Sequence, residues 1–184
     1  MQRFRTMGVI LMLAAVFAYR VAGHAQAPKA KAGAPPAPPA KAAPAAPKHT
    51  MLTAADLKWG PGPDALPPGV QMAVVDGDPS KAGSPFVIRA KMPNGYRVPP
   101  HFHPTDENII VISGNFALGM GDKWDDASMK WLGVNGFARM PKTMHHYALT
   151  KGDTEIQVHG VGPFSLTYID PKDDPRKKTT TASK

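Results

Sequence analysis

The chain has 184 residues, no cysteine and a formal net charge of +8. This length fits one domain with a hydrophobic core, and the lack of thiols excludes disulfide bridges, thiolate metal sites and cysteine nucleophiles. Residues 1–48 hold seven Lys or Arg and no acidic residue, whereas residues 49–175 hold 11 basic and 14 acidic residues. The predicted folded part is therefore mildly acidic, and we expect it not to bind nucleic acid.

Residues 1–27 have the order of a secretory signal peptide. Arg3 and Arg5 precede an apolar run from Met7 to Tyr19, and small residues follow up to Ala27. A membrane anchor is the alternative, but this run of 13 residues is shorter than the roughly 20 needed to span a bilayer. We therefore expect cleavage after Ala27, a periplasmic or secreted protein, and no stable membrane insertion after cleavage.

Two further segments have compositions that do not favour a packed core. Residues 28–48 are almost entirely Pro, Ala and Lys, which predicts a disordered linker. Residues 176–184 contain four basic residues and no acidic one, and we expect them to form a basic disordered tail. The folded domain is thus predicted to span residues 49–175.

Residues 49–175 alternate short apolar stretches with clusters of Gly, Pro, Asn and Asp, which is typical of an all-β domain. The pairs Asn94–Gly95, Gly114–Asn115 and Gly121–Asp122 predict turns, and 53–57 is the only helix-like stretch. Closure into a barrel or jelly roll would protect the edges of so many short strands. The predicted strands are 72–75, 86–91, 107–112, 116–120, 129–132, 136–140, 146–149, 155–161 and 164–168.

The segment GYRVPPHFHPTDENIIVISG, residues 95–114, contains the clearest chemical pattern. His101 and His103 are two residues apart, so in an extended chain both imidazoles project from the same side and can converge on one ion. Pro99 and Pro100 disfavour a helix here. Glu107 adds an oxygen ligand, and such a set of nitrogen and oxygen donors suits a divalent metal with open coordination positions.

This skeleton, from Gly95 through the two histidines and Glu107 to Gly114, resembles the first motif of the cupin family. The likeness extends over about residues 50–176, where ADLKWGPGPDALPPG, GDPSKAGSPF, GMGDKWD and VHGVGPFSLTYIDPKDDP resemble a group of small exported bacterial cupins of unassigned function. The resemblance implies a single cupin barrel, a double-stranded β-helix or jelly roll, with one metal ion inside.

A second cupin motif would supply one more histidine ligand, five residues after a proline. Here Pro141 places His146 at that position, although Thr143 stands where the family has glycine and Thr150 where it has asparagine. Adjacent residues of a strand face opposite sides, so only one of His145 and His146 can point into the barrel. Motif register favours His146, with His145 as the competitor.

Other side chains are candidates for substrate contact or catalysis. His159, in the strand-like EIQVHGVG, is interpreted as a proton-transfer residue beside the metal, or else as a hydrogen-bonded core or rim histidine. Tyr96, Arg97 and Tyr147 are candidate substrate-binding residues, as is Tyr168, with a structural role as the alternative for each.

The predicted function is metal-dependent chemistry on a small organic molecule, with oxygenase, isomerase, lyase and hydrolase reactions all open. The alternative is a non-catalytic periplasmic module that binds a metal or a small ligand. The resemblance favours manganese or iron, while zinc, nickel and cobalt also suit such ligands. Because cupins commonly pair through barrel edges, a homodimer is a further expectation.

Overall fold

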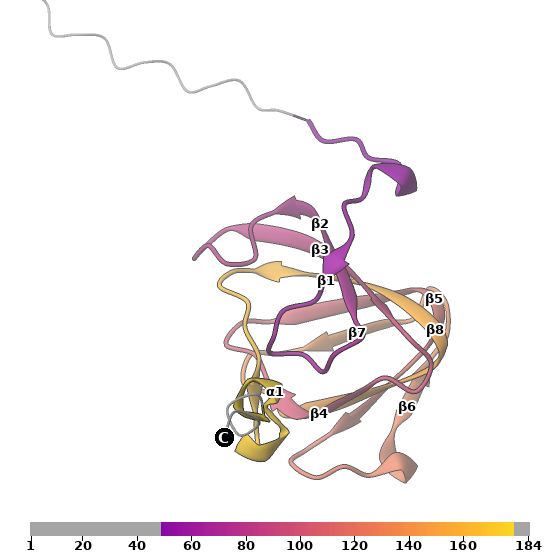
Figure 1. Ribbon diagram of the computed structural model, residues 1–184, viewed down its shortest axis with the longest axis vertical. Coiled ribbons are helices and arrows are strands. Elements are labelled where there is room, and N and C mark those ends of the chain that lie inside the picture. Colours follow the sequence, from indigo (N-terminus) through magenta and orange to yellow (C-terminus); the bar gives the residue numbers. More distant parts are fainter. Residues whose placement is uncertain (1–48, 179–184) are drawn as a thin grey trace, which may run out of the picture. The chain divides into compact units, whose positions relative to one another are not determined.

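The computed structural model describes residues 49–178 (Figure 1). The predicted signal peptide and linker lie outside the described residues, as does the tail from residue 179 onward. The nine strands are β1 (Gly60–Pro61), β2 (Gln71–Gly77), β3 (Pro85–Met92), β4 (Arg97–Phe102), β5 (Glu107–Met120), β6 (Lys130–Leu132), β7 (Phe137–Met140), β8 (His146–Val161) and β9 (Thr167–Tyr168). Short helical segments are η1 (Ala54–Asp56), η2 (Asp126–Ser128), η3 (Pro171–Asp173) and α1 (Pro175–Lys178).

Two long strands, β5 and β8, organise the barrel (Figure 1). They pair antiparallel along their whole length, from Asn108 opposite His159 to Met120 opposite His146. The first half of β8 also pairs with β4, and the second half with β3. The sheet therefore curls into two facing halves joined by β5 and β8, which confirms the predicted cupin jelly roll.

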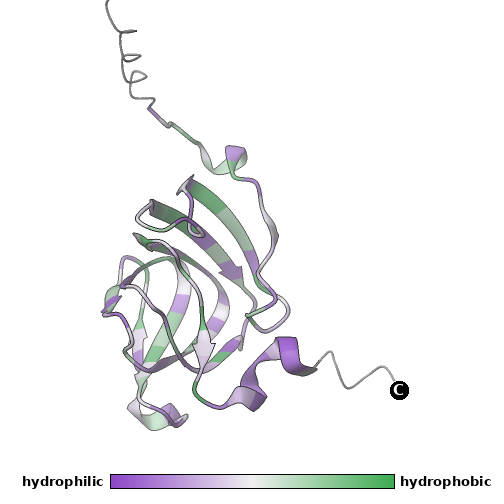
Figure 2. Ribbon diagram, turned by 90° about the vertical axis from the view of Figure 1, so that its left-hand side faces the viewer, coloured by the Kyte–Doolittle hydropathy of each residue, from purple (hydrophilic) through white to green (hydrophobic). Residues whose placement is uncertain are grey.

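The interior of the barrel is apolar because alternate side chains of each long strand face inward. Burial alternates along β3, where Phe86, Ile88, Ala90 and Met92 are buried, as expected for strands with one face on a core. Figure 2 shows the resulting alternation of hydrophobic and hydrophilic residues along the strands. Within residues 49–178 no helix is long and apolar enough to cross a membrane.

Several predicted boundaries differ from the structure. The strands predicted at 107–112 and 116–120 form one strand, β5, and those at 146–149 and 155–161 form β8. Gly114–Asn115 therefore does not end a strand. Gly114 instead has φ +76° and sits at a register shift between β5 and β8, where an added Cβ would lie 2.5 Å from the Asp153 oxygen. The predicted strand at 164–168 shortens to β9, and neither β1 nor β4 was among the predicted strands, although the segment of His101 was expected to be extended.

The predicted disordered tail is wrong at its start, because residues from Pro175 to Lys178 form helix α1. The Asp174 carboxylate stabilises this turn by accepting hydrogen bonds from the Arg176 backbone N–H at 3.1 Å and from its guanidinium at 2.7 and 2.8 Å. A carboxylate at a helix start offsets the unpaired backbone N–H groups there. The basic composition of residues 176–184 did not predict this helix cap.

Candidate metal centre

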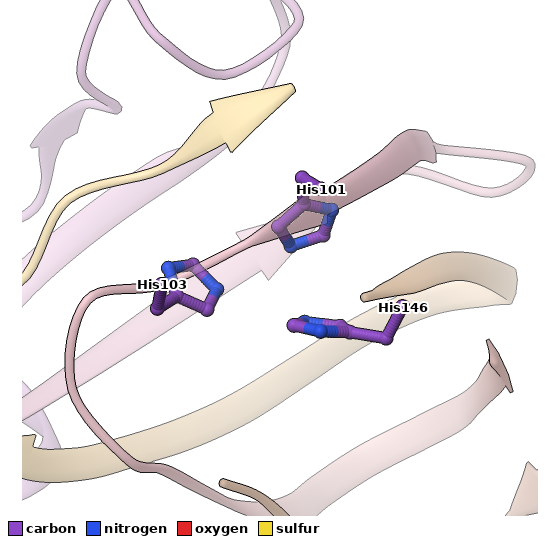
Figure 3. Close-up of side chains that lie close together, drawn as sticks. All are labelled: His101, His103 and His146. Atoms are coloured by element: carbon purple, nitrogen blue, oxygen red, sulfur yellow. The ribbon is translucent and has the colours of Figure 1, made fainter. Parts of the chain in front are cut away.

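Three buried imidazoles come together inside the barrel. His101 lies in β4, His103 follows the end of that strand, and His146 begins β8. Their candidate ligand atoms all lie within 4.8 Å of one another, and the residues are 2–5% exposed. Figure 3 shows the three rings turned toward a common space. The structure thus brings together three of the four predicted ligands as a group that could hold a metal ion.

The local chain explains this convergence. His101 and His146 are direct partners in the β4–β8 pairing, so their side chains stand on the same face of neighbouring strands. His103 follows His101 by two residues and keeps its side, as the alternation of extended chain requires. The motif glycine Gly95 adopts φ +75° in the predicted Asn94–Gly95 turn, a conformation that glycine reaches without a steric cost. This turn leads directly into β4, the strand that carries His101.

The hydrogen bonds of the rings leave one nitrogen of each free for a ligand. The Nδ1 atoms of His101, His103 and His146 lie 2.7, 2.7 and 2.9 Å from the backbone oxygens of Pro99, Ser165 and Met144. A carbonyl oxygen can only accept, so each Nδ1 carries the hydrogen and each Nε2 presents its lone pair. Outer partners of this kind fix the tautomer and orientation of metal-binding histidines.

Glu107, the fourth predicted ligand, points at the same space from the start of β5. Its Oε2 atom lies 3.3 Å from His146 Nε2 and 3.5 Å from His103 Nε2. Ligand atoms about 2.1 Å from one ion are about 3.0 Å apart at right angles and about 3.4 Å apart in a tetrahedron. The Glu107 separations therefore match the edges of a coordination polyhedron.

The burial of these groups makes a cation the natural occupant. Within the described residues, Glu107 Oε2 and His103 Nε2 are both buried without a hydrogen-bond partner, which is costly for polar atoms and more so for a carboxylate. Burial opposes ionisation of Glu107, but His103 and His146 hold its pKa well below the usual range. Burial also lowers the pKa of His101 to about 3. The buried Glu107 charge therefore requires a positive partner, which is either a proton on a facing imidazole or a metal cation.

Glu107 also acts on His103. Although burial works in the opposite direction, the Glu107 carboxylate raises the pKa of His103. A proton on His103 Nε2 would lie between this atom and Glu107 Oε2, and a metal ion would contact the same two atoms. A metal ion must therefore displace that proton when it binds.

The turn that contains Pro141 and Met144 joins β7 to β8 and contacts two of the candidate ligands. Its Thr143 N–H donates to the backbone oxygen of His103 at 2.8 Å, and its Met144 oxygen receives the His146 ring. Thr143 has φ +62°, a left-handed conformation that favours glycine. The backbone therefore keeps the shape expected of the cupin motif even though the glycine is replaced.

Asp106, the residue before Glu107, is hydrogen-bonded to the same turn. The Asp106 carboxylate accepts hydrogen bonds from the Lys142 N–H at 2.8 Å and from the Arg139 guanidinium at 2.6 Å. Asp106 is thereby tied to both β7 and the turn before His146. The sequence motif did not single out Asp106, because its partners are far away along the chain.

The choice between the adjacent histidines is settled geometrically in favour of His146. His146 is 2% exposed and belongs to the cluster. His145 points away from the barrel interior, where its Nδ1 lies 2.5 Å from Asp122 Oδ1 and its ring stacks on Phe102 with centroids 5.3 Å apart. Pleat alternation thus separates the two, as the sequence argument required.

The structure places His159 outside the central cavity, which favours the interpretation as a core or rim histidine over that of a proton-transfer residue beside the metal. Along the second half of β8, Thr154, Ile156 and Val158 are buried, while the residues between them are only half-buried. His159 follows Val158 and therefore faces outward, and it does not line the central cavity. The apolar residues Ile156 and Val158 marked the inner face in the sequence, and this signal was missed.

Two of the predicted substrate contacts, Arg97 and Tyr147, do not line the central cavity. Arg97 is exposed, and its guanidinium carbon lies 3.8 Å from the centre of the Trp124 ring. Tyr147 is fully buried, but its hydroxyl bonds to Asp125 and Ser128, so it holds the η2 segment rather than a ligand. Arg97 precedes the inward-facing Val98, and Tyr147 follows the inward-facing His146. Because side chains alternate along a strand, both Arg97 and Tyr147 face outward.

The remaining tyrosines lie inside but are engaged. Tyr96 lines the cavity and donates its hydroxyl hydrogen to the Pro67 oxygen, and burial raises its pKa. Tyr168 donates to the Ala65 oxygen at 2.8 Å, and its ring centroid is 6.3 Å from that of His101. Both tyrosines therefore fasten the segment before β2 across the barrel.

A cavity of about 410 Å³ extends from the candidate ligands through the barrel. His101, His103, Glu107 and His146 all line it, and most of the other lining residues are apolar. Phe164 also lines it and stacks on His103, with ring centroids 4.4 Å apart. This size is typical of sites for small molecules.

Comparison with solved structures gives the same fold. A candidate acetylacetone dioxygenase from Methylibium petroleiphilum is 18% identical with a TM-score of 0.53, covering 70% of this chain and 85% of that one. The polyketide cyclase RemF from Streptomyces resistomycificus is 16% identical with a TM-score of 0.55, covering 73% and 95%. At such identities the likeness extends to the fold alone.

A more distant likeness is to the Rhodobacter sphaeroides SigE complex with the anti-sigma ChrR, at 19% identity and a TM-score of 0.42, covering 59% of this chain and 50% of that one. No curated protein matches the sequence. The sequence profile of the ChrR cupin-like domain matches residues 47–165, which is more than half of the chain. The chain therefore belongs to the ChrR cupin-like family of the cupin superfamily.

Proposed function

We propose that the protein is a divalent-metal enzyme that transforms a small organic molecule inside the barrel. The observation that carries this proposal is the cluster of three buried imidazoles at the wall of a cavity, two of which face the buried Glu107 carboxylate. When bound there, the ion would supply Lewis acidity or oxygen activation. Manganese or iron suits this nitrogen and oxygen set, with zinc, nickel and cobalt as alternatives.

The roles of the chain follow from its geometry. His101, His103, Glu107 and His146 would hold the ion, and the hydrogen-bonded Nδ1 atoms of the three histidines keep their rings aimed without further reorganisation. The apolar wall excludes water from the centre and strengthens electrostatic interactions inside it. Phe164 covers one face of His103. The substrate would therefore meet the centre in a largely dry space.

Proton transfer has few candidates. Glu107 is the only carboxylate among the described residues that line the cavity, and the Tyr96 hydroxyl is engaged by Pro67. This favours reactions that need no separate general base. The same observation supports the second candidate function, a module that binds a small ligand at the metal without changing it.

Turnover separates these two functions. The purified protein would be loaded with each of the five metals in turn, incubated with pooled small organic molecules, and followed by mass spectrometry and oxygen consumption. An enzyme forms product in the wild type and none in a His101→Ala/His103→Ala variant. A binding module retains a compound unchanged, and neither turnover nor retention with any metal would contradict both functions.

We also propose that the protein acts outside the cytoplasm. The support is the order of charged, apolar and small residues in 1–27. N-terminal sequencing of the protein recovered from the cell envelope or medium should then begin at Pro28. An intact Met1 terminus on the folded, metal-filled protein would contradict export by cleavage.

A further inference from the structure

The body of the cavity differs chemically from its metal end, and this difference bears on the ligand. Beyond the four candidate ligands, most lining residues are apolar, including Ile88, Phe116 and Ile156. The class of ligand that we infer from this difference rests on the proposed metal centre, to which the ligand would bind.

Strand register gives the apolar wall an order. Val98, Ala148 and Leu118 are consecutive partners across β4, β8 and β5, and all three line the cavity. Ala148 is two residues from His146 along β8, so this row lies about 6.6 Å from the histidine row. A ligand that reaches inward from the ion therefore touches hydrocarbon first.

The next row continues the apolar wall. Phe116 pairs with Thr150 across β5 and β8, two residues beyond Ala148. Thr150 is buried and its hydroxyl donates to the Pro93 oxygen at 2.7 Å. Tyr96 stands beside it, with its N–H 2.8 Å from the Thr150 hydroxyl oxygen. The polar groups of this row are thus already engaged, at a depth of about 13 Å from the histidine row.

The other polar lining residues lie where the cavity opens. Ser80, Ser165 and Arg176 are exposed, so they mark the mouth rather than the interior. Arg176 is bound through its guanidinium to Asp174, which offsets its charge. Among the described residues, therefore, no charged side chain other than the candidate ligands faces the body of the cavity.

We propose that the ligand is a small amphipathic molecule, with a polar head that carries oxygen donors at the ion and a hydrocarbon body against Val98, Ala148 and Leu118. A ligand polar along its whole length would leave its inner polar groups without partners, at a large cost in affinity. A hydrocarbon body instead gains affinity with each buried methylene.

A series of alkyl hydroxamates tests this proposal by binding. Acetohydroxamate, butanohydroxamate, hexanohydroxamate and octanohydroxamate share one metal-binding head and differ only in tail length. Their dissociation constants for the metal-loaded protein are measured by calorimetry, with metal content checked afterwards. We expect affinity to rise about fourfold per methylene up to hexanohydroxamate, and then to level off as the cavity fills.

Two substitutions on β8 localise the effect. Ala148→Phe should fill the wall beside the ion and abolish the dependence on tail length, while acetohydroxamate still binds. Leu149→Phe is the matched control, because Leu149 is half-buried on the opposite face, and it should keep the wild-type dependence. If Ala148→Phe does not fold, Val98→Thr keeps the volume of the wall and should weaken the dependence.

The outcomes separate this inference from the proposed metal centre. Affinity that is independent of tail length in a metal-loaded protein would overturn the amphipathic ligand and leave the metal centre intact. A protein that takes up no metal and binds no hydroxamate would overturn the proposed centre itself.

Discussion

Five histidines in and beside the strands of the barrel fall into two regions with opposite chemistry. His101, His103 and His146 are buried together inside the barrel. His145 and His159 lie on the outer faces of the strands, where His145 meets Asp122. The two regions contain the same residue type and differ by strand parity, so the pleat rather than the residue decides which histidines can act together.

The consequence is clearest within one strand. β8 begins with His146 on the inner face and carries His159 near its end on the outer face. The two positions differ by 13, an odd number, and alternate residues face opposite sides of a strand. The predictions below test whether function follows this division.

The largest effect is expected at the adjacent histidines His145 and His146, at the start of β8. His146→Ala removes a buried ligand and should weaken metal binding by more than about 100-fold, since even outer partners of metal ligands are worth about 10–100-fold. His145→Ala should change it less than about twofold, because the side chain faces outward. Competition with a chelator of known affinity measures both, and equal effects of the two substitutions would remove the basis of the division.

A smaller effect is expected from the residue that holds the turn before His146. Asp106→Asn weakens the contacts to Arg139 and Lys142 and should lower metal affinity by about tenfold, because the ligands then lose their fixed spacing. The same competition assay measures it.

Asp122→Asn is the matched control for Asp106, since that carboxylate contacts His145 on the outer face. It should leave metal affinity unchanged. If both substitutions lowered metal affinity equally, the loss of a negative charge would explain the effect of Asp106→Asn, and the position of the ligands would not.

On the outer side, Tyr147→Phe should affect stability but not the metal. Its hydroxyl bonds to the Asp125 backbone and the Ser128 hydroxyl, and the loss of such buried partners costs about 1–2 kcal/mol in the free energy of unfolding. Urea unfolding of the metal-free protein measures this change. An unchanged unfolding midpoint together with weaker metal binding would contradict the assignment of Tyr147 to the outer side of the barrel.

The smallest effect is expected at His159. His159→Gln alters a half-buried residue outside the cavity, so stability should change by less than about 0.5 kcal/mol and turnover of any identified substrate should be unaffected. A loss of turnover with intact metal content would show that His159 does reach the reaction.

Much of the fold and of the candidate site could be predicted because the evidence was local. The spacing from Gly95 to Gly114 identified the barrel and placed His101, His103 and Glu107, and register with Pro141 selected His146. These features depend on residues within about 20 positions, over which strand parity is preserved.

What was missed depends on contacts between distant segments. The carbonyl oxygens of Pro99, Met144 and Ser165 fix the imidazoles, yet every residue carries such an oxygen and the sequence does not mark these three. The outward direction of Arg97 and Tyr147 follows from parity, which was applied to His145 and His146 but not to their neighbours. The predicted homodimer and the metal identity stay predictions.

Elemental analysis of the purified protein beside a His101→Ala/His103→Ala variant tests the central claim most directly. We expect one divalent ion per chain in the wild type and none in the variant, with the β-sheet circular dichroism spectrum kept in both. A wild type that holds no ion after reconstitution with any of the five metals, or a folded variant that still holds one, would contradict the account.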